Sequence, residues 1–184
     1  MKVIIFSAPS GSGKTTLVKH ALEVFPRLAF SISCTTRSPR GEETHGKDYY
    51  FLSPEEFKSK IAEGAFVEYE EVYTDKFYGT LKDEVQRIWD ENKVVIFDVD
   101  VKGGIALKKY FGAQALSIFI KPPSVEELER RLISRGTDDE TTIRTRISKA
   151  EEELSYQHQF DKIVTNENLS DAKKEVESLI QSFI

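Results

Sequence analysis

Short apolar runs alternate along the chain with segments of helical period. Val3–Phe6, Val94–Phe97 and Leu116–Ile120 are almost continuously apolar, which is typical of strands buried on both faces of a parallel sheet. Apolar residues at helical spacing recur after the first run and near the end of the chain, at Leu17, Val18, Ala21, Leu22 and Phe25, then Val176, Leu179, Ile180 and Phe183. This alternation predicts an α/β fold in which helices flank a parallel sheet.

Two stretches do not follow the alternation. Residues from about 33 to 85 are rich in Tyr, Thr, Arg and Glu and have weak strand patterns, so we expect an inserted lobe there. Residues from about 125 to 155 carry several arginines between two helical patterns that Gly136 separates, which predicts a helix–turn–helix excursion. The core of a single domain is then expected at about 1–32, 86–124 and 156–184.

Two helix starts have the sequence of a capping box. Ser53-Pro-Glu-Glu56 and Ser124-Val-Glu-Glu127 each place a serine three residues before a glutamate. Pro54 also occupies the favoured first position of its helix. We therefore predict helices that begin directly after Ser53 and Ser124.

Composition limits the classes of function. The 184-residue chain has a formal net charge of -5, which argues against a general nucleic-acid binder. Its single cysteine, Cys34, excludes an internal disulfide and is expected to be a small semi-buried residue. No stretch approaches the roughly 20 apolar residues of a membrane helix, so we expect a cytoplasmic protein without a membrane partner.

The segment between the first strand and the first helix is close to a nucleotide-binding P-loop. Gly13-Lys14-Thr15 supplies the second half of the pattern, but Ala8 stands where the first glycine is usual. A glycine-rich turn that enters a helix points backbone N–H groups at one anion, Lys14 can reach the outer phosphates, and the Thr15 hydroxyl can bind Mg²⁺. We expect Ala8 to have negative φ, since a left-handed alanine is costly. The residues predicted to hold ATP here are Ala8, Pro9, Ser10, Gly11, Ser12, Gly13, Lys14, Thr15 and Thr16.

The second long apolar run ends in two acidic residues, Asp98 and Asp100. Side chains two residues apart on a strand point to the same side, and ligands of α/β sheets collect at the carboxyl ends of strands. Asp100 is closer to that end, so we favour it for the magnesium shell, through water, with Asp98 as the second choice.

In order along the chain, the motifs resemble those of guanylate kinases. The resemblance rests on the P-loop and on segments that cover essentially the whole sequence: Ser31–Gly41, Gly46–Phe51, Phe66–Tyr69, Tyr78–Thr80, Asp98–Gly103, Pro122–Ser124 and Arg130–Gly136. It implies a P-loop core, a GMP-binding lobe, a mobile lid, and transfer of the γ-phosphoryl group of MgATP to GMP. Lys102 departs from the family, which often has Gln at that position, and Ile147 stands where Leu is usual.

The resemblance also implies roles for individual residues. The phosphate of GMP is assigned to Arg37, Arg40, Tyr49 and Tyr78. Glu68 falls where the family reads the edge of guanine, with Ser33 and Thr80 as hydroxyl partners and Asp98 in the same pocket. The implied lid arginines are Arg131, Arg135 and Arg146, and Asn166 is assigned to the neighbourhood of the adenine of ATP. The catalytic set is therefore Lys14, Arg37, Arg131, Arg135 and Arg146.

The reaction does not require a general base, because the phosphate of GMP is already mostly ionised near neutral pH. Mg²⁺ is the only expected cofactor, ATP and GMP are the expected partners, dGMP is a further expected acceptor, and the chain is expected to be a monomer or a weak homodimer. Two alternatives remain open on the sequence. One is a catalytically silent guanylate-kinase-like module that binds protein, and the other is a P-loop kinase for a different phosphorylated acceptor.

Overall fold

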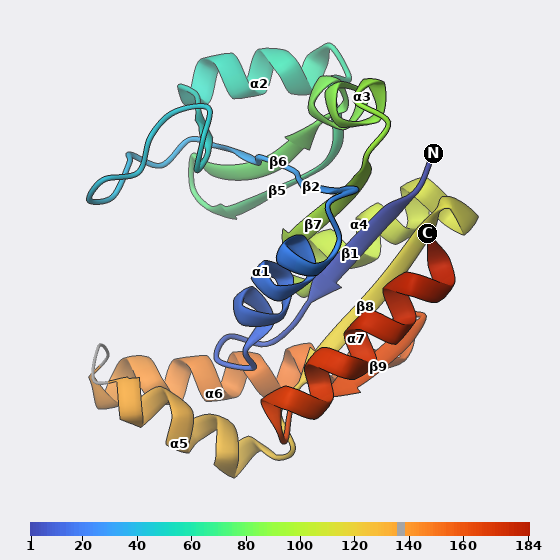
Figure 1. Cartoon of the computed structure of the whole chain (residues 1–184). Helices are drawn as coiled ribbons and strands as arrows, with labels where there is room; N and C mark the ends of the chain where they lie inside the picture. The colour runs from blue at the N-terminus through green and yellow to red at the C-terminus, as the bar shows by residue number, and fades with distance from the viewer. Residues whose placement is uncertain (136–138) are drawn as a thin grey trace.

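The computed structural model describes residues 1–135 and 139–184, except for the side chains of Tyr73 and Arg135. Figure 1 shows a core between two projecting parts, a mixed lobe at one end and a helical pair at the other. The expected break at Gly136 lies outside the described residues. No helix among the described residues combines the length and the apolar character needed to cross a membrane.

The core is a parallel sheet in the order β2-β7-β1-β8-β9, here called the core sheet. Its strands are β1 (Val3–Ser7), β2 (Leu28–Phe30), β7 (Val94–Val99), β8 (Ala115–Lys121) and β9 (Lys162–Thr165). The three apolar runs are the three central strands, and the sequence predicted all of them. The α/β fold with helices flanking a parallel sheet is confirmed.

Alternate residues of the central strand β1 face different helices. Ile4 and Phe6 pack with α1 (Lys14–Val24) and α7 (Leu169–Phe183), whereas Val3 and Ile5 pack with α3 (Lys82–Asp90) and α4 (Val101–Phe111). All of these strand side chains are fully buried. The strand is apolar without interruption because both of its faces are covered. The connections after α4 and α6 are short 3₁₀ turns, at Gly112–Gln114 and Gln157–Gln159.

The lobe has a separate sheet in the order β4-β3-β6-β5, here called the lobe sheet. Its elements are β3 (Cys34–Thr35), β4 (Tyr50–Phe51), α2 (Pro54–Ala62), β5 (Phe66–Tyr73) and β6 (Lys76–Leu81). Cys34 lies in a small apolar core with Phe57, Phe66 and Phe77, and burial raises the pKa of its thiol to about 12. The cysteine is fully buried, which is deeper than the semi-buried position expected from the sequence.

Helix α2 begins as its sequence predicted. The Ser53 hydroxyl accepts a hydrogen bond from Glu56 N, and the Glu56 carboxylate accepts one from Ser53 N. The second predicted box is only half formed. Ser124 Oγ accepts from Glu127 N at 3.2 Å, but the Glu127 carboxylate binds Arg130 and Arg131.

The helical pair consists of α5 (Val125–Arg135) and α6 (Glu140–Ser155) and is here called the lid. Leu128, Leu132 and Ala150 are buried between the two helices. The lobe and the lid therefore each have an apolar cluster of their own, apart from those of the core sheet.

Candidate functional site

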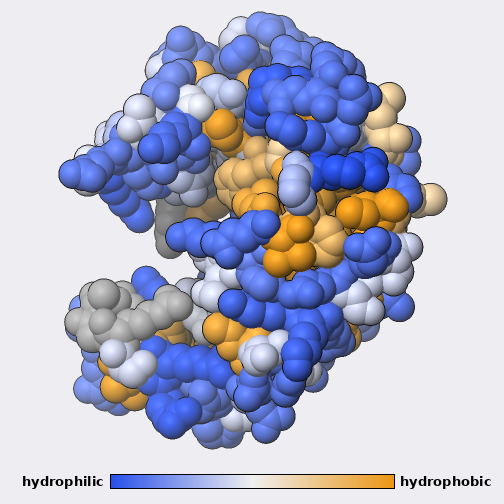
Figure 2. Space-filling view, in the orientation of Figure 1, coloured by the Kyte–Doolittle hydropathy of each residue, from blue (hydrophilic) through white to orange (hydrophobic). Residues whose placement is uncertain are grey.

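The lobe and the lid face each other across a cavity of about 630 Å³ at the carboxyl end of the core sheet. Figure 2 shows this cavity as a deep hollow between the two projecting parts. The P-loop lines one part of it, at residues 8–16. Ser33, Tyr49, Glu68 and Tyr78 line the part that belongs to the lobe, and Asp98 and Asp100 lie between the two. We call this cavity the cleft.

The P-loop has the backbone of an anion site. Gly11 and Gly13 have φ of 95° and 90°, values that favour glycine, and Gly13 precedes α1 without a side-chain cap. The first N–H groups of α1 are therefore directed at the cleft. A Cβ at Gly13 would lie 2.3 Å from Asn166 Nδ2, so this position also lacks room for a side chain.

Ala8 does not have positive φ. Among the described residues, the only non-glycine residues with that conformation are Asp75 and Asn92. The prediction that the loop needs no glycine at this position is confirmed. Ala8 is instead buried in the apolar cluster beneath α1.

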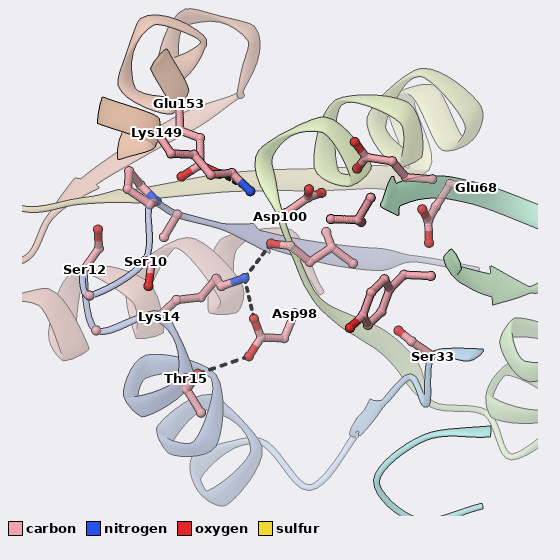
Figure 3. A pocket seen from close by; sticks show the side chains of 18 of the residues that line it. Ser10, Ser12, Lys14, Thr15, Ser33, Glu68, Asp98, Asp100, Lys149 and Glu153 are labelled. Carbon is pink, nitrogen blue, oxygen red and sulfur yellow. Dashed lines mark hydrogen bonds and ion pairs between the residues drawn. The ribbon is translucent and has the colours of Figure 1, made fainter. Parts of the chain in front are cut away.

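The P-loop side chains meet the acidic end of β7. Lys14 Nζ lies 2.6 Å from Asp98 Oδ1 and donates a hydrogen bond to the Val99 carbonyl. Thr15 Oγ1 lies 3.5 Å from Asp98 Oδ2. Figure 3 shows these side chains converging below the glycine-rich turn.

Asp98 and Asp100 have different surroundings despite their spacing. Asp98 is still in β7 and faces the P-loop, whereas Asp100 caps α4 by accepting a hydrogen bond from Gly103 N at 2.8 Å. The Asp100 carboxylate raises the pKa values of Glu68 and Glu70 on β5, after the larger effect of burial. The structure thus places Asp98 rather than Asp100 beside Thr15, whereas the sequence favoured Asp100 for the magnesium shell.

Among the described residues, no group of three or more His, Cys, Asp or Glu side chains could hold a metal ion alone. Thr15 and Asp98 nevertheless suit Mg²⁺. This ion is commonly bound through one or two protein oxygens, with waters and substrate phosphates completing its shell. One hydroxyl and one carboxylate at the floor of an open cleft match that requirement.

The predicted base-reading residues lie together in the lobe. Glu68 is on β5, and its Oε1 accepts a hydrogen bond from the Thr80 hydroxyl of β6 at 2.9 Å. Thr80 is fully buried, and Ser33 lines the same part of the cleft. Burial raises the pKa of Glu68 to about 7, opposed by the Thr80 hydrogen bond and increased further by Asp100.

The Arg37 side chain contacts Tyr49 and Glu43. Its guanidinium lies 4.8 Å from the centre of the Tyr49 ring and forms two bonds to the Glu43 carboxylate, at 2.6 and 2.8 Å. This ion pair lowers the pKa of Glu43 to about 2 and raises that of Arg37 further. Tyr49 and Tyr78 contact each other and line the cleft. The Arg40 side chain is exposed, and neither arginine is part of the cleft wall in this conformation.

The lid arginines approach the P-loop from the other side. Arg146 on α6 lies 3.5 Å from the Ser10 hydroxyl. Arg131 on α5 donates to the Asn166 carbonyl at 2.9 Å and pairs with Glu127 at 2.8 Å. The Arg135 side chain lies outside the described residues.

Asn166 supports the P-loop directly. Its side-chain amide donates to the Ser12 carbonyl at 2.8 Å, and only 5% of the residue is exposed. In this structure the Asn166 side chain anchors the P-loop, and its expected place near adenine stays a prediction.

Several cleft residues were missed by reasoning from the sequence. Lys149 and Glu153 on α6 line the cleft and lie 3.8 Å apart, and Figure 3 shows both pointing into it. They follow Arg146 at spacings of three and seven residues, so one helix face carries all three. That spacing was the available signal. Glu70 was also missed, and its carboxylate lies 3.9 Å from Lys102, the residue that departs from the family pattern.

Comparison with known proteins gives one consistent result. The sequence profile described as guanylate kinase matches residues 1–183. The guanylate kinase of Bacteroides fragilis is 55% identical over 183 residues, covering 100% of this chain and 90% of that protein. The guanylate kinase of Porphyromonas gingivalis is 55% identical over 184 residues, covering 100% and 98%. Among solved structures, the guanylate kinase from Anaplasma phagocytophilum matches with a TM-score of 0.75 and 27% identity, covering 98% of this chain and 85% of that one.

Proposed function

The chain belongs to the guanylate kinase family, and we infer from this membership and from the cleft that it is an ATP:GMP phosphotransferase. It transfers the γ-phosphoryl group of ATP to GMP and releases ADP and GDP. The observation that carries this conclusion is the shared cavity. One wall is a P-loop with Lys14, and the other holds the half-buried carboxylate of Glu68.

The P-loop binds the phosphates of ATP in this proposal. The N–H groups at the start of α1 and the ammonium group of Lys14 face the cleft and bear positive charge. Thr15 and Asp98 would hold Mg²⁺ through their side-chain oxygens. The ion would supply positive charge that offsets the charge of the ATP phosphates.

Glu68 selects guanine. Its ionised carboxylate can accept hydrogen bonds from the N1–H and the 2-amino group, and adenine has no donors in those positions. Thr80 fixes the orientation of the carboxylate, because its hydroxyl donates to one of the two oxygens. A mismatched base would leave this half-buried carboxylate with the Thr80 hydroxyl but without the two donors of guanine, which is the condition for strong discrimination.

The phosphate of GMP is bound by Arg37, Arg40, Tyr49 and Tyr78. The planar fork of an arginine matches two phosphate oxygens, and in this structure the Glu43 carboxylate occupies that fork on Arg37. The Glu43 carboxylate thus holds the guanidinium in place beside Tyr49.

The chemical step depends on charge and alignment, because a GMP phosphate with a second pKa of about 6 is mostly a dianion near neutral pH. Bringing it in line with the γ-phosphate of ATP requires cations around both. Lys14 and Arg37 supply part of that charge, and closure of the lid adds Arg131, Arg135 and Arg146 while it excludes water.

The remaining assignments complete the proposal. The protein works in purine nucleotide metabolism in the cytoplasm, uses dGMP as well as GMP, requires Mg²⁺, and is a monomer or a weak homodimer.

A coupled assay of ADP release tests the function. The purified protein with MgATP is offered GMP, dGMP, AMP, CMP or UMP, with Lys14→Met as the inactive control. Turnover is expected with GMP and dGMP, at rates far above those with the other three acceptors. Equal turnover with AMP would contradict the guanine assignment, and a lack of turnover with every acceptor would favour a binding module.

A further inference from the structure

A buried carboxylate lies where the lobe joins the core. Glu84 is in the first turn of α3, directly after the last strand of the lobe sheet, and its side chain is only 2% exposed. Arg87, one turn later on the same helix, donates from Nε at 3.0 Å and from Nη2 at 2.9 Å. The proposed mechanism gives Glu84 no contact with either substrate.

Two further donors reach Glu84 from distant parts of the chain. Ile32 N donates to Oε1 at 3.0 Å, and the Tyr50 hydroxyl donates to Oε2 at 3.1 Å. Each carboxylate oxygen thus accepts two hydrogen bonds, which fills the roughly four acceptor positions of an ionised carboxylate. A buried charge is tolerated when it is paired and saturated in this way.

These donors are the chain neighbours of residues in the GMP site. Ile32 directly precedes Ser33, and Tyr50 directly follows Tyr49. Tyr50 N also donates to the Ser33 carbonyl at 2.9 Å, which joins the two segments behind the cleft wall.

Glu84 also connects the two chain crossings between core and lobe. Ile32 lies between β2 of the core sheet and β3 of the lobe sheet, and α3 carries the chain back from β6 to β7. A carboxylate on the returning segment that binds the backbone of the outgoing segment restricts how the lobe tilts relative to the core. Among the described residues, the hydrogen bonds of Glu84 go to Ile32, Tyr50 and Arg87, outside the P-loop and the lid.

We propose that Glu84 is a positioning residue for GMP, and that its four hydrogen bonds hold the lobe and the segments carrying Ser33 and Tyr49 in the geometry that accepts the nucleotide. The inference rests on the proposed function, because it assigns GMP to this part of the cleft. Without the carboxylate, ordering of these segments becomes a cost of GMP binding, while ATP binding is unaffected.

Steady-state kinetics with Glu84→Gln, Tyr50→Phe and a matched control test the proposal. Glu91→Gln is the control, because Glu91 also pairs with Arg87 at 2.9 Å but is exposed and has no contact with the lobe. For Glu84→Gln, the KM for GMP is expected to rise about tenfold, with kcat and the KM for ATP within about twofold of wild type. Tyr50→Phe should raise the KM for GMP about threefold, and Glu91→Gln should leave all three values unchanged.

The hydrogen-exchange rate of the Ile32 backbone amide gives an independent measurement. It should be faster in Glu84→Gln than in wild type or Glu91→Gln, because the bond to the carboxylate protects it. If Glu84→Gln does not fold, the KM for GMP of Tyr50→Phe tests the proposal alone. That variant removes only the hydroxyl that donates to Glu84 and keeps the aromatic ring. A lower melting temperature with an unchanged KM for GMP, or equal rises in both KM values, would show a purely structural role. Wild-type turnover of GMP separates failure of this inference from failure of the proposed function.

Discussion

Raising the pH from about 6 to about 8 is expected to strengthen GMP binding about tenfold through Glu68. Burial raises the pKa of this carboxyl to about 7, from an ordinary value of 4.5, and Asp100 adds to the rise. The protonated form carries a donor hydrogen and cannot accept from both N–H groups of guanine. Only the ionised fraction of the empty enzyme is therefore competent to bind GMP.

The size of the effect follows from that fraction. With a pKa of about 7, about 9% of Glu68 is ionised at pH 6, about half at pH 7 and about 91% at pH 8. The apparent KM for GMP is the intrinsic value divided by the competent fraction. Between pH 6 and pH 8 it therefore falls from about 11 times to about 1.1 times its limiting value. Most of this fall occurs between pH 6 and pH 7.5.

The assay is the KM for GMP at saturating MgATP across this pH range, with the KM for ATP measured in parallel. The phosphate of GMP has its own second pKa of about 6 and adds a separate dependence. Glu68→Gln reports that dependence alone, because the amide does not titrate. The wild-type curve should fall more steeply than the Glu68→Gln curve, and parallel curves would refute a role for ionised Glu68 in binding guanine.

Three other predictions concern the P-loop and stability. Lys14→Met should lower kcat by about 10² to 10³-fold with an unchanged circular dichroism spectrum, because it removes a cation from the phosphates; near-normal turnover would contradict its assignment. Gly13→Ala should lower the free energy of unfolding by about 1–3 kcal/mol in urea titrations, because its φ of 90° and the 2.3 Å approach to Asn166 both oppose a Cβ. The matched change Ala8→Gly should cost no more than about 1 kcal/mol, and a similar loss in both variants would disprove this explanation. At pH 8, Glu68→Gln should be more stable than wild type by about 1–3 kcal/mol in the same titration, because ionisation of a carboxyl with a raised pKa opposes folding above its ordinary pKa. The difference should disappear near pH 4, where both unfolded and folded Glu68 are protonated.

The sequence determined those features that depend on neighbouring residues. A strand covered on both faces has to be apolar throughout, so the three central strands of the core sheet were visible as runs. Helix α2 was visible because a capping box is complete within four residues, Ser53–Glu56. The P-loop could also be recognised from the sequence, because its glycines, Lys14 and Thr15 lie within a few residues of one another.

The roles of Asp98 and Asp100 required the tertiary structure. Period-two alternation places both on the same side and does not distinguish them. Strand β7 ends at Val99, so Asp98 remains in the strand opposite Lys14, whereas Asp100 turns to cap α4. The end of one strand, which the sequence does not specify to a single residue, decided which carboxylate meets the P-loop.

Glu84 shows more clearly that the sequence alone does not specify the surroundings of an acidic residue. By sequence it is an acidic residue in the first turn of an amphipathic helix, a position usually exposed to solvent. Its partners Ile32 and Tyr50 are 52 and 34 residues away along the chain, and only folding brings them to one carboxylate. Local sequence specified the three central strands, the cap of α2 and the phosphate loop, since short-range sterics and hydrogen bonds set them. Only the tertiary structure decided which groups surround Asp98, Glu68 and Glu84, because donors near each carboxylate come from other elements of the fold.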